Sequence, residues 1–186
     1  MLLLAHLGCT TAAVRISQKS VLKRPIDYRL VALMAILPDV IDRSLYVFVI
    51  PGAESGRLFA HTLLFNLVLL AILVAIRRDL WIYGVLPLVH LLLDLRCLSG
   101  DQLFWPFCGP DLTNVHISDC LAGTAGQSYG GRIRDRIEDV LSTYRGVGLR
   151  ALLSDAGGLV ALVILALKAR LYERRRLARL VVTGRI

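Results

Sequence analysis

The stretch LFAHTLLFNLVLLAILVAI, residues 58–76, is the clearest candidate for a membrane-spanning helix in this chain. It is nineteen residues long and contains no Asp, Glu, Lys or Arg. At 1.5 Å per residue such a helix is about 28 Å long, roughly the thickness of the hydrocarbon core of a bilayer. The stretch therefore predicts a transmembrane helix.

The rest of the chain is also rich in apolar segments. Apolar residues make up 56% of the sequence and charged residues 19%, with a mean hydropathy of +0.64. A soluble chain usually has about 45–50% apolar and about 25% charged residues. The further apolar segments are residues 1–14, 30–50, 80–95 and 151–169, of which the first is short. We expect an all-α integral membrane protein with about four transmembrane helices, forming a single membrane domain over residues 1–186.

The basic residues predict the orientation of this domain. Fourteen of the 22 Lys and Arg residues lie in 15–29, 77–79 and 168–186, which places these segments in the cytoplasm by the positive-inside rule. The polar, glycine-rich segment 96–150 is then an extramembrane loop or interfacial insertion before the last helix, with an amphipathic helix near 132–145. The tail 168–186 is expected to lie against anionic lipids of the inner leaflet.

The net charge and the cysteine spacing also bear on the class of protein. The net charge of +8 comes from clusters between apolar runs and is not interleaved with aromatic residues, which argues against nucleic acid as a partner. No cysteine pair has CxxC spacing. Cys97 and Cys108 are either a disulfide or free thiols.

Titratable side chains inside the apolar segments carry the functional signal. Such groups are costly in a membrane and usually functional. They include six histidines and aspartates, His6, Asp39, Asp42, His61, His90 and Asp94. His90 and Asp94 are spaced i and i+4, and Asp39 and Asp42 i and i+3, so each pair shares a helix face.

All six groups are expected near the same membrane face, opposite the basic turns. Imidazole and carboxylate together suit zinc, with manganese or iron as alternatives. The pattern predicts a centre holding one, two or more divalent ions. Taken singly, each residue has an ordinary structural explanation, such as a helix cap at Asp39, a core histidine at His6, or an ion pair of Asp42 with Arg57.

The residues that form this pattern resemble the YdjM-like family of inner-membrane proteins. The matching pieces are His6, the LPDxxD element 37–42, the pair His61-Thr62 and the block HLLLDLRCLSGDQLFWPF at 90–107. The resemblance covers about residues 1–107. It implies a metal-dependent hydrolase in the bacterial cytoplasmic (inner) membrane, which with the expected topology places the metal site on the outer side and the basic tail in the cytoplasm.

The chain departs from this family pattern in two places. Gly56 stands where the family has a histidine, and Asp42 lies one place later than the family aspartate. A looser similarity links the order of these residues to zinc-dependent phospholipase C and related zinc nucleases. That similarity implies His6, Asp42, His61, His90 and Asp94 as ligands.

The sequence thus favours a hydrolase acting at the membrane–water interface on a phosphoester of a lipid or lipid-linked substrate. Asp39 is the expected general base and Arg57 the expected phosphate contact, since a guanidinium suits a bidentate contact with an oxyanion. The alternatives are a transport or relay protein for metal ions or protons, and a non-catalytic membrane binding protein. The oligomeric state is left open.

Overall fold

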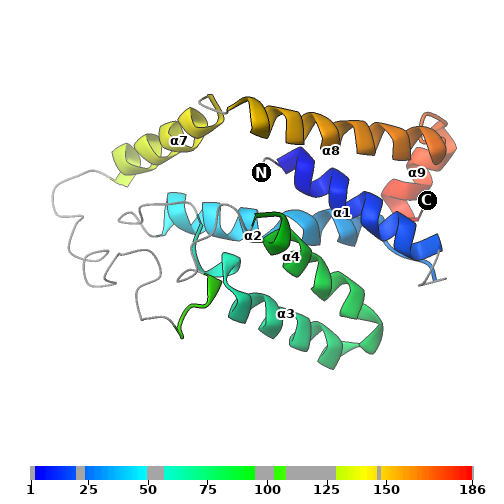
Figure 1. Ribbon diagram of the computed structural model, residues 1–186, viewed down its shortest axis with the longest axis horizontal. Helices are drawn as coiled ribbons and strands as arrows, with labels where there is room; N and C mark the ends of the chain where they lie inside the picture. The colour runs from blue at the N-terminus through cyan, green and yellow to red at the C-terminus, as the bar shows by residue number, and fades with distance from the viewer. Residues whose placement is uncertain are drawn as a thin grey trace.

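The computed structural model describes residues 3–19, 24–49, 57–94, 103–107, 129–145 and 148–185, and this part of the chain is helical (Figure 1). Gly56, Cys97 and Cys108 lie outside the described residues, so the expectations about them stay predictions.

Within the described residues, two short 3-10 helices accompany the α-helices. They are η2 (Phe59–His61) and η3 (Arg78–Leu80). The α-helices are α1 (Leu3–Ser17), α2 (Tyr28–Phe48), α3 (Leu63–Ile76), α4 (Trp81–Asp94), α7 (Tyr129–Arg145), α8 (Leu149–Lys168) and α9 (Arg174–Thr183). The amphipathic helix expected near 132–145 is present as α7.

The expectation of about four transmembrane helices is wrong. Among the described residues, no helix combines the length and the apolar character that a membrane crossing requires. The segment 58–76 is not one helix, because residues 59–61 form η2 and the Thr62 hydroxyl caps α3 by accepting from the N–H of Phe65. The remaining helix has fourteen residues and is about 21 Å long. The all-helical part of the expectation agrees with the structure.

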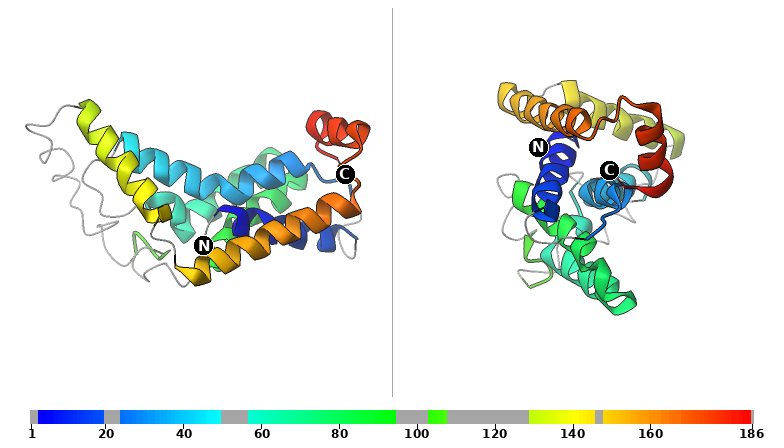
Figure 2. Two further views of the ribbon diagram at one scale, coloured as in Figure 1. Left: turned by 90° about the horizontal axis from the view of Figure 1, so that it is seen from above. Right: turned by 90° about the vertical axis from the view of Figure 1, so that its right-hand side faces the viewer.

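Helices α1, α2 and α4 pack against one another, and α8 covers the outer side of α1 (Figure 2). The crossing of α1 with α8 is unusually close. A Cβ atom built on Gly8 would lie 2.2 Å from the carbonyl oxygen of Gly158, so the absence of side chains at both positions is what lets these backbones approach. The contact is held by Asp155, which accepts a hydrogen bond from the backbone N–H of Ala5 at 2.8 Å.

Helices α3 and α4 form a hairpin that projects from the rest of the molecule (Figure 1). Many α3 side chains are exposed, whereas α4 packs against α2 and contributes to the main apolar cluster. That cluster contains Val14, Ile26, Tyr28, Val31, Ile82, Tyr83 and Leu86. The hairpin turn lies beside the residues just before α2, where Arg24 donates hydrogen bonds to Asp79.

The basic C-terminal segment contains α9, which is joined to the start of α2. The backbone N–H of Tyr28 donates to the Gly184 carbonyl at 2.7 Å. Arg29 donates to the carbonyls of Val181 and Val182 at 3.3 and 2.8 Å, which satisfies carbonyls at the end of α9. The expected location of this tail in the cytoplasm stays a prediction.

Candidate metal centre

Asp42 organises the backbone around the candidate centre. It lies in α2 and is fully buried. Its carboxylate accepts hydrogen bonds from the backbone N–H groups of Leu58, Ala60 and His61 at 2.6, 2.8 and 3.2 Å. These N–H groups precede α3, and Asp42 supplies a side-chain acceptor for each of them; the N–H of His61 also donates to the Leu58 carbonyl at 3.3 Å. Asp42 therefore fixes the turn that carries His61.

The same carboxylate determines which nitrogen of His61 is available. Nδ1 of His61 lies 2.7 Å from Oδ2 of Asp42. An ionised carboxylate can only accept, so Nδ1 carries the proton and Nε2 presents its lone pair. Nε2 of His61 is buried and has no hydrogen-bond partner.

His90 repeats this arrangement with a carbonyl in place of the carboxylate. Its Nδ1 donates to the backbone carbonyl of Ala35 in α2 at 2.8 Å. Pro38 lies in the following turn of α2, where a proline loosens the helical hydrogen bonding. Nε2 of His90 is also buried and without a hydrogen-bond partner.

Asp39 faces both of these lone pairs. Its Oδ1 lies 3.6 Å from Nε2 of His61, and its Oδ2 lies 4.0 Å from Nε2 of His90. One ligand atom from each of the three residues lies within 4.8 Å of the others. Two buried imidazoles with fixed tautomers and a carboxylate between them have the donor set and the outer partners of a protein metal site.

A second group of three residues adjoins the first. Nε2 of His6 in α1 lies 3.2 Å from Oδ1 of Asp94, although the two atoms are not aligned as a hydrogen bond. The His6 ring stacks on the His90 ring with centroids 3.9 Å apart. His6, His90 and Asp94 also bring ligand atoms within 4.8 Å of one another.

Arg57 contacts Asp94 at the more exposed side of the cluster. Its Nε and Nη2 lie 3.3 and 3.2 Å from Oδ2 of Asp94. The Arg57 side chain is 34% exposed, whereas those of His6 and Asp94 are 0% and 1% exposed. Arg57 is therefore the member of the cluster that solvent reaches most easily.

Burial and neighbouring charges determine the protonation of this second side. Burial lowers the pKa of the His90 imidazole to about 4; the His6 ring adds to the shift, and the Asp39 carboxylate opposes it. Burial by itself raises the pKa of the Asp94 carboxyl, but hydrogen-bonding and positively charged neighbours, with His6 first and Arg57 among them, outweigh it and hold that pKa well below its usual range. His90 is thus neutral and Asp94 ionised at neutral pH, as metal ligands must be.

The structure brings all the sequence-derived candidates into one region. It divides them by role, because Asp42 lies behind His61 while Asp39 faces both free imidazole nitrogens. Neither the Ala35 carbonyl nor Asn66 was predicted from the sequence. The buried side-chain amide of Asn66 donates to the carbonyls of Ala60 and Thr62 at 2.8 and 2.7 Å. The sequence feature that could have indicated Asn66 is its position as a single amide side chain within the apolar sequence of α3.

The fold and this cluster define a class, that of all-helical proteins with buried histidines and aspartates suited to a divalent metal. A family model for the YdjM inner membrane protein matches residues 1–177, and the chain belongs to that family. The match confirms the suspected resemblance and extends it beyond residue 107. The family is one of inner membrane proteins, in agreement with the expected location.

Comparisons with curated proteins and with solved structures found no match. The similarity to phospholipase C and zinc nucleases has no support from these comparisons.

Proposed function

We propose that this protein is a metal-dependent hydrolase that cleaves a phosphoester of a lipid or lipid-linked substrate. The observation that carries the proposal is the pair of buried, unpartnered Nε2 atoms of His61 and His90, which face the Asp39 carboxylate. Burying a polar atom without a hydrogen-bond partner costs free energy. Two such atoms held in fixed orientations therefore support a role as ligands of a metal ion.

In this proposal Asp39, His61 and His90 hold the ion. Mixed nitrogen and oxygen donors suit zinc first, then manganese or iron. A divalent ion at this place would act as a Lewis acid toward the phosphoester and would make water a better nucleophile near neutral pH. Asp42 and the Ala35 carbonyl keep the two imidazoles in the tautomer that leaves Nε2 free.

His6 and Asp94 are assigned either to the same ion or to a second one. His90 offers only Nε2, because its Nδ1 donates to Ala35. One nitrogen lone pair serves one ion, so the two groups that share His90 cannot each hold a separate ion through it. A second ion would therefore have to rely on His6 and Asp94 without His90.

Arg57 is the proposed contact for the substrate phosphate. It is held against Asp94 and is the most exposed side chain among the residues described above for the cluster. A guanidinium presents a fork of donors that fits a phosphate oxygen pair. The second carboxylate oxygen of Asp39 is the proposed acceptor for a proton from water.

The test measures metal content and phosphoester hydrolysis in the purified protein and in a His90→Ala/Asp94→Ala variant. Glu138→Gln in α7 is the matched control, because Glu138 is an exposed carboxylate paired with Arg134. We expect the double variant to lose both bound metal and turnover while the control keeps both. Equal turnover in the double variant would refute the proposal. Metal-dependent ion flux without lipid turnover would favour the transport alternative.

A further inference from the structure

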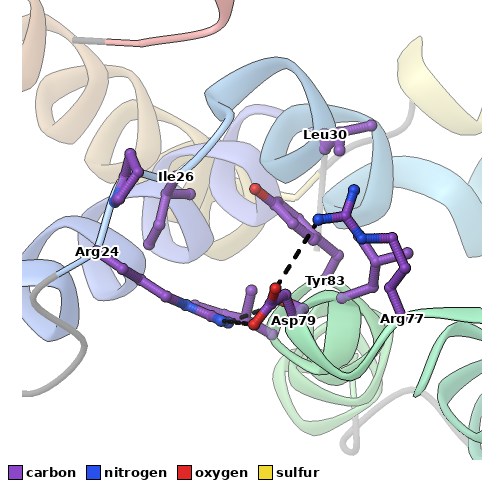
Figure 3. Close-up of a pocket in the computed structure, with 9 residues that line it drawn as sticks. Arg24, Ile26, Leu30, Arg77, Asp79 and Tyr83 are labelled. Atoms are coloured by element: carbon purple, nitrogen blue, oxygen red, sulfur yellow. Dashed lines mark hydrogen bonds and ion pairs between the residues drawn. The ribbon is translucent and has the colours of Figure 1, made fainter.

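A cavity of about 410 Å³ lies at the end of the α3–α4 hairpin that is remote from the candidate metal centre (Figure 3). It lies between residues 24–26, the start of α2 and the hairpin turn. Tyr83 lines it, and His90 follows seven residues later in α4, about 10 Å further along the helix axis. The cavity is therefore a different place from the centre described above.

Most of the cavity wall is apolar. Ile26 and Ile82 are buried members of the main apolar cluster, and Leu30 and Leu80 pack against the same cluster. The volume lies in the range of ligand sites in proteins, which are mostly apolar with a few placed polar groups. The body of a suitable ligand is therefore apolar.

The charged groups at this cavity come from Arg24, Arg77 and Asp79 (Figure 3). Arg24 donates to the Asp79 carboxylate at 3.2 Å and to its backbone carbonyl at 2.9 Å. The Arg24 guanidinium also lies 5.8 Å from the centre of the Trp81 ring. These contacts orient Arg24 before any ligand arrives.

Arg77 approaches the same carboxylate from the other side, with Nη2 3.9 Å from Oδ2 of Asp79. Its side chain is 71% exposed, so this ion pair is weak. Two guanidinium groups share one carboxylate, and one positive charge remains in excess. An anion at the cavity mouth would balance that charge.

We propose that this cavity binds an amphiphile with a phosphate-type head group. The head group lies against Arg24 and Arg77, and the alkyl part lies along Ile26, Leu30 and Ile82. Arginine forks suit phosphate oxygens, and the apolar wall favours a chain over a free ion. Phospholipids of a membrane are amphiphiles of this kind, and the chain belongs to a family of inner membrane proteins. The proposal does not depend on hydrolysis at the metal centre.

The test measures binding of decylphosphonate to the full-length protein in an uncharged detergent. A phosphonate has no phosphoester bond to cleave, so turnover at the metal centre cannot interfere. The titration is repeated in the His90→Ala/Asp94→Ala variant, which removes phosphonate binding at the proposed metal centre and should leave binding at the cavity unchanged. Methylphosphonate supplies the head group alone, and decanol supplies the chain alone. We expect decylphosphonate to bind at least about tenfold more tightly than either, since both parts contribute to its affinity. Methylphosphonate binding equally tightly would indicate a free-phosphate site and overturn the amphiphile assignment.

Substitutions at the cavity mouth separate a ligand site from a structural ion pair. Arg77→Ala removes an exposed side chain and is expected to weaken decylphosphonate binding about tenfold, the size of one lost charge-assisted contact. Arg78→Ala is the matched control, because Arg78 belongs to the same turn and is not among the residues that line the cavity. Its affinity should be unchanged.

Asp79→Asn gives the opposite expectation. It removes the competing carboxylate, so decylphosphonate should bind more tightly even though the pair with Arg24 is lost. Unchanged or weaker binding in Asp79→Asn, or equal affinity in wild type and Arg77→Ala, would overturn the proposal. Metal content is measured in the variants at positions 77, 78 and 79 and should stay at the wild-type level, which separates this site from the metal centre.

Discussion

Nδ1 of His61 lies 2.7 Å from Oδ2 of Asp42, and both side chains are fully buried. This contact leaves Nε2 of His61 facing Asp39 instead of Asp42. Two aspartates three residues apart in α2 thus have different roles. Asp39 faces the proposed ion, and Asp42 holds the histidine that faces it.

Asp42→Asn tests this division of roles. Only one of the two terminal atoms of an asparagine side chain accepts hydrogen bonds. In one orientation its NH₂ group would face backbone N–H donors, and in the other it would face Nδ1 of His61, so one set of contacts is lost. We expect metal affinity to fall about 10–100-fold, as for other outer partners of ligating histidines. Stability should fall by about 2 kcal/mol or more, because buried donors lose a charged acceptor. Calorimetric metal titration and denaturant unfolding measure the two effects, and wild-type affinity in this variant would contradict the assignment.

Arg57→Gln tests the proposed phosphate contact. Loss of the guanidinium should lower kcat/KM for a phosphoester about 10–100-fold, since one or two charge-assisted hydrogen bonds are removed. Arg57→Lys should recover only part of the loss, because an ammonium group keeps the charge without the fork. Steady-state kinetics of the wild type and the two variants measures these changes in kcat/KM. An unchanged kcat/KM in Arg57→Gln would remove Arg57 from the substrate site.

The crossing of α1 and α8 gives a test of the fold. Gly158→Ala places a Cβ atom 2.2 Å from the carbonyl oxygen of Leu4, which is backbone and cannot move cheaply. We expect a loss of about 1–3 kcal/mol in unfolding free energy, in line with overpacking elsewhere.

Gly157→Ala is the matched control at the next position. A Cβ atom there would have nothing within 4 Å, so the substitution should raise stability by about 0.5–1 kcal/mol through helix propensity. Equal effects of the two substitutions would show that α1 and α8 do not cross at these glycines.

The junction between α2 and α9 predicts a dependence on pH. Hydrogen bonds from Arg29 hold the pKa of the Asp27 carboxyl below its ordinary value of 3.8, against the effect of burial. A carboxyl with a lowered pKa in the folded protein stabilises it above the unfolded pKa, and this stability is lost as the pH falls below about 3.8.

Asp27→Asn keeps a side chain that can cap α2 but does not titrate. Unfolding measured from pH 5 to pH 2.5 should therefore show a smaller acid-induced loss in the variant than in the wild type. Parallel curves for the two proteins would show that Asp27 does not contribute to acid sensitivity.

The sequence predicted the members of the candidate centre well and their partners poorly. The spacing of His90 and Asp94 does place both in one cluster. Yet Asp94 contacts His6 and Arg57, while His90 contacts Ala35 and faces Asp39. Helical spacing fixes a shared face, but the nitrogen that remains free depends on neighbours contributed by other helices.

The expected transmembrane span failed for a local reason. Composition alone makes residues 58–76 continuous, since none is charged. The backbone departs from the α-helix at 58–61 because the buried Asp42 carboxylate binds N–H groups there, and Thr62 then starts α3. Asp42, sixteen positions before Leu58, therefore determines where this helix begins. A prediction made from the composition of residues 58–76 alone does not take Asp42 into account.

The most direct test of the proposed centre is anomalous diffraction from crystals grown with zinc, recorded at the zinc absorption edge. We expect a peak about 2.0–2.2 Å from Nε2 of His61, Nε2 of His90 and one carboxylate oxygen of Asp39. A map with no peak among these three atoms, or a peak bound through Asp42 in place of Asp39, would contradict this expectation.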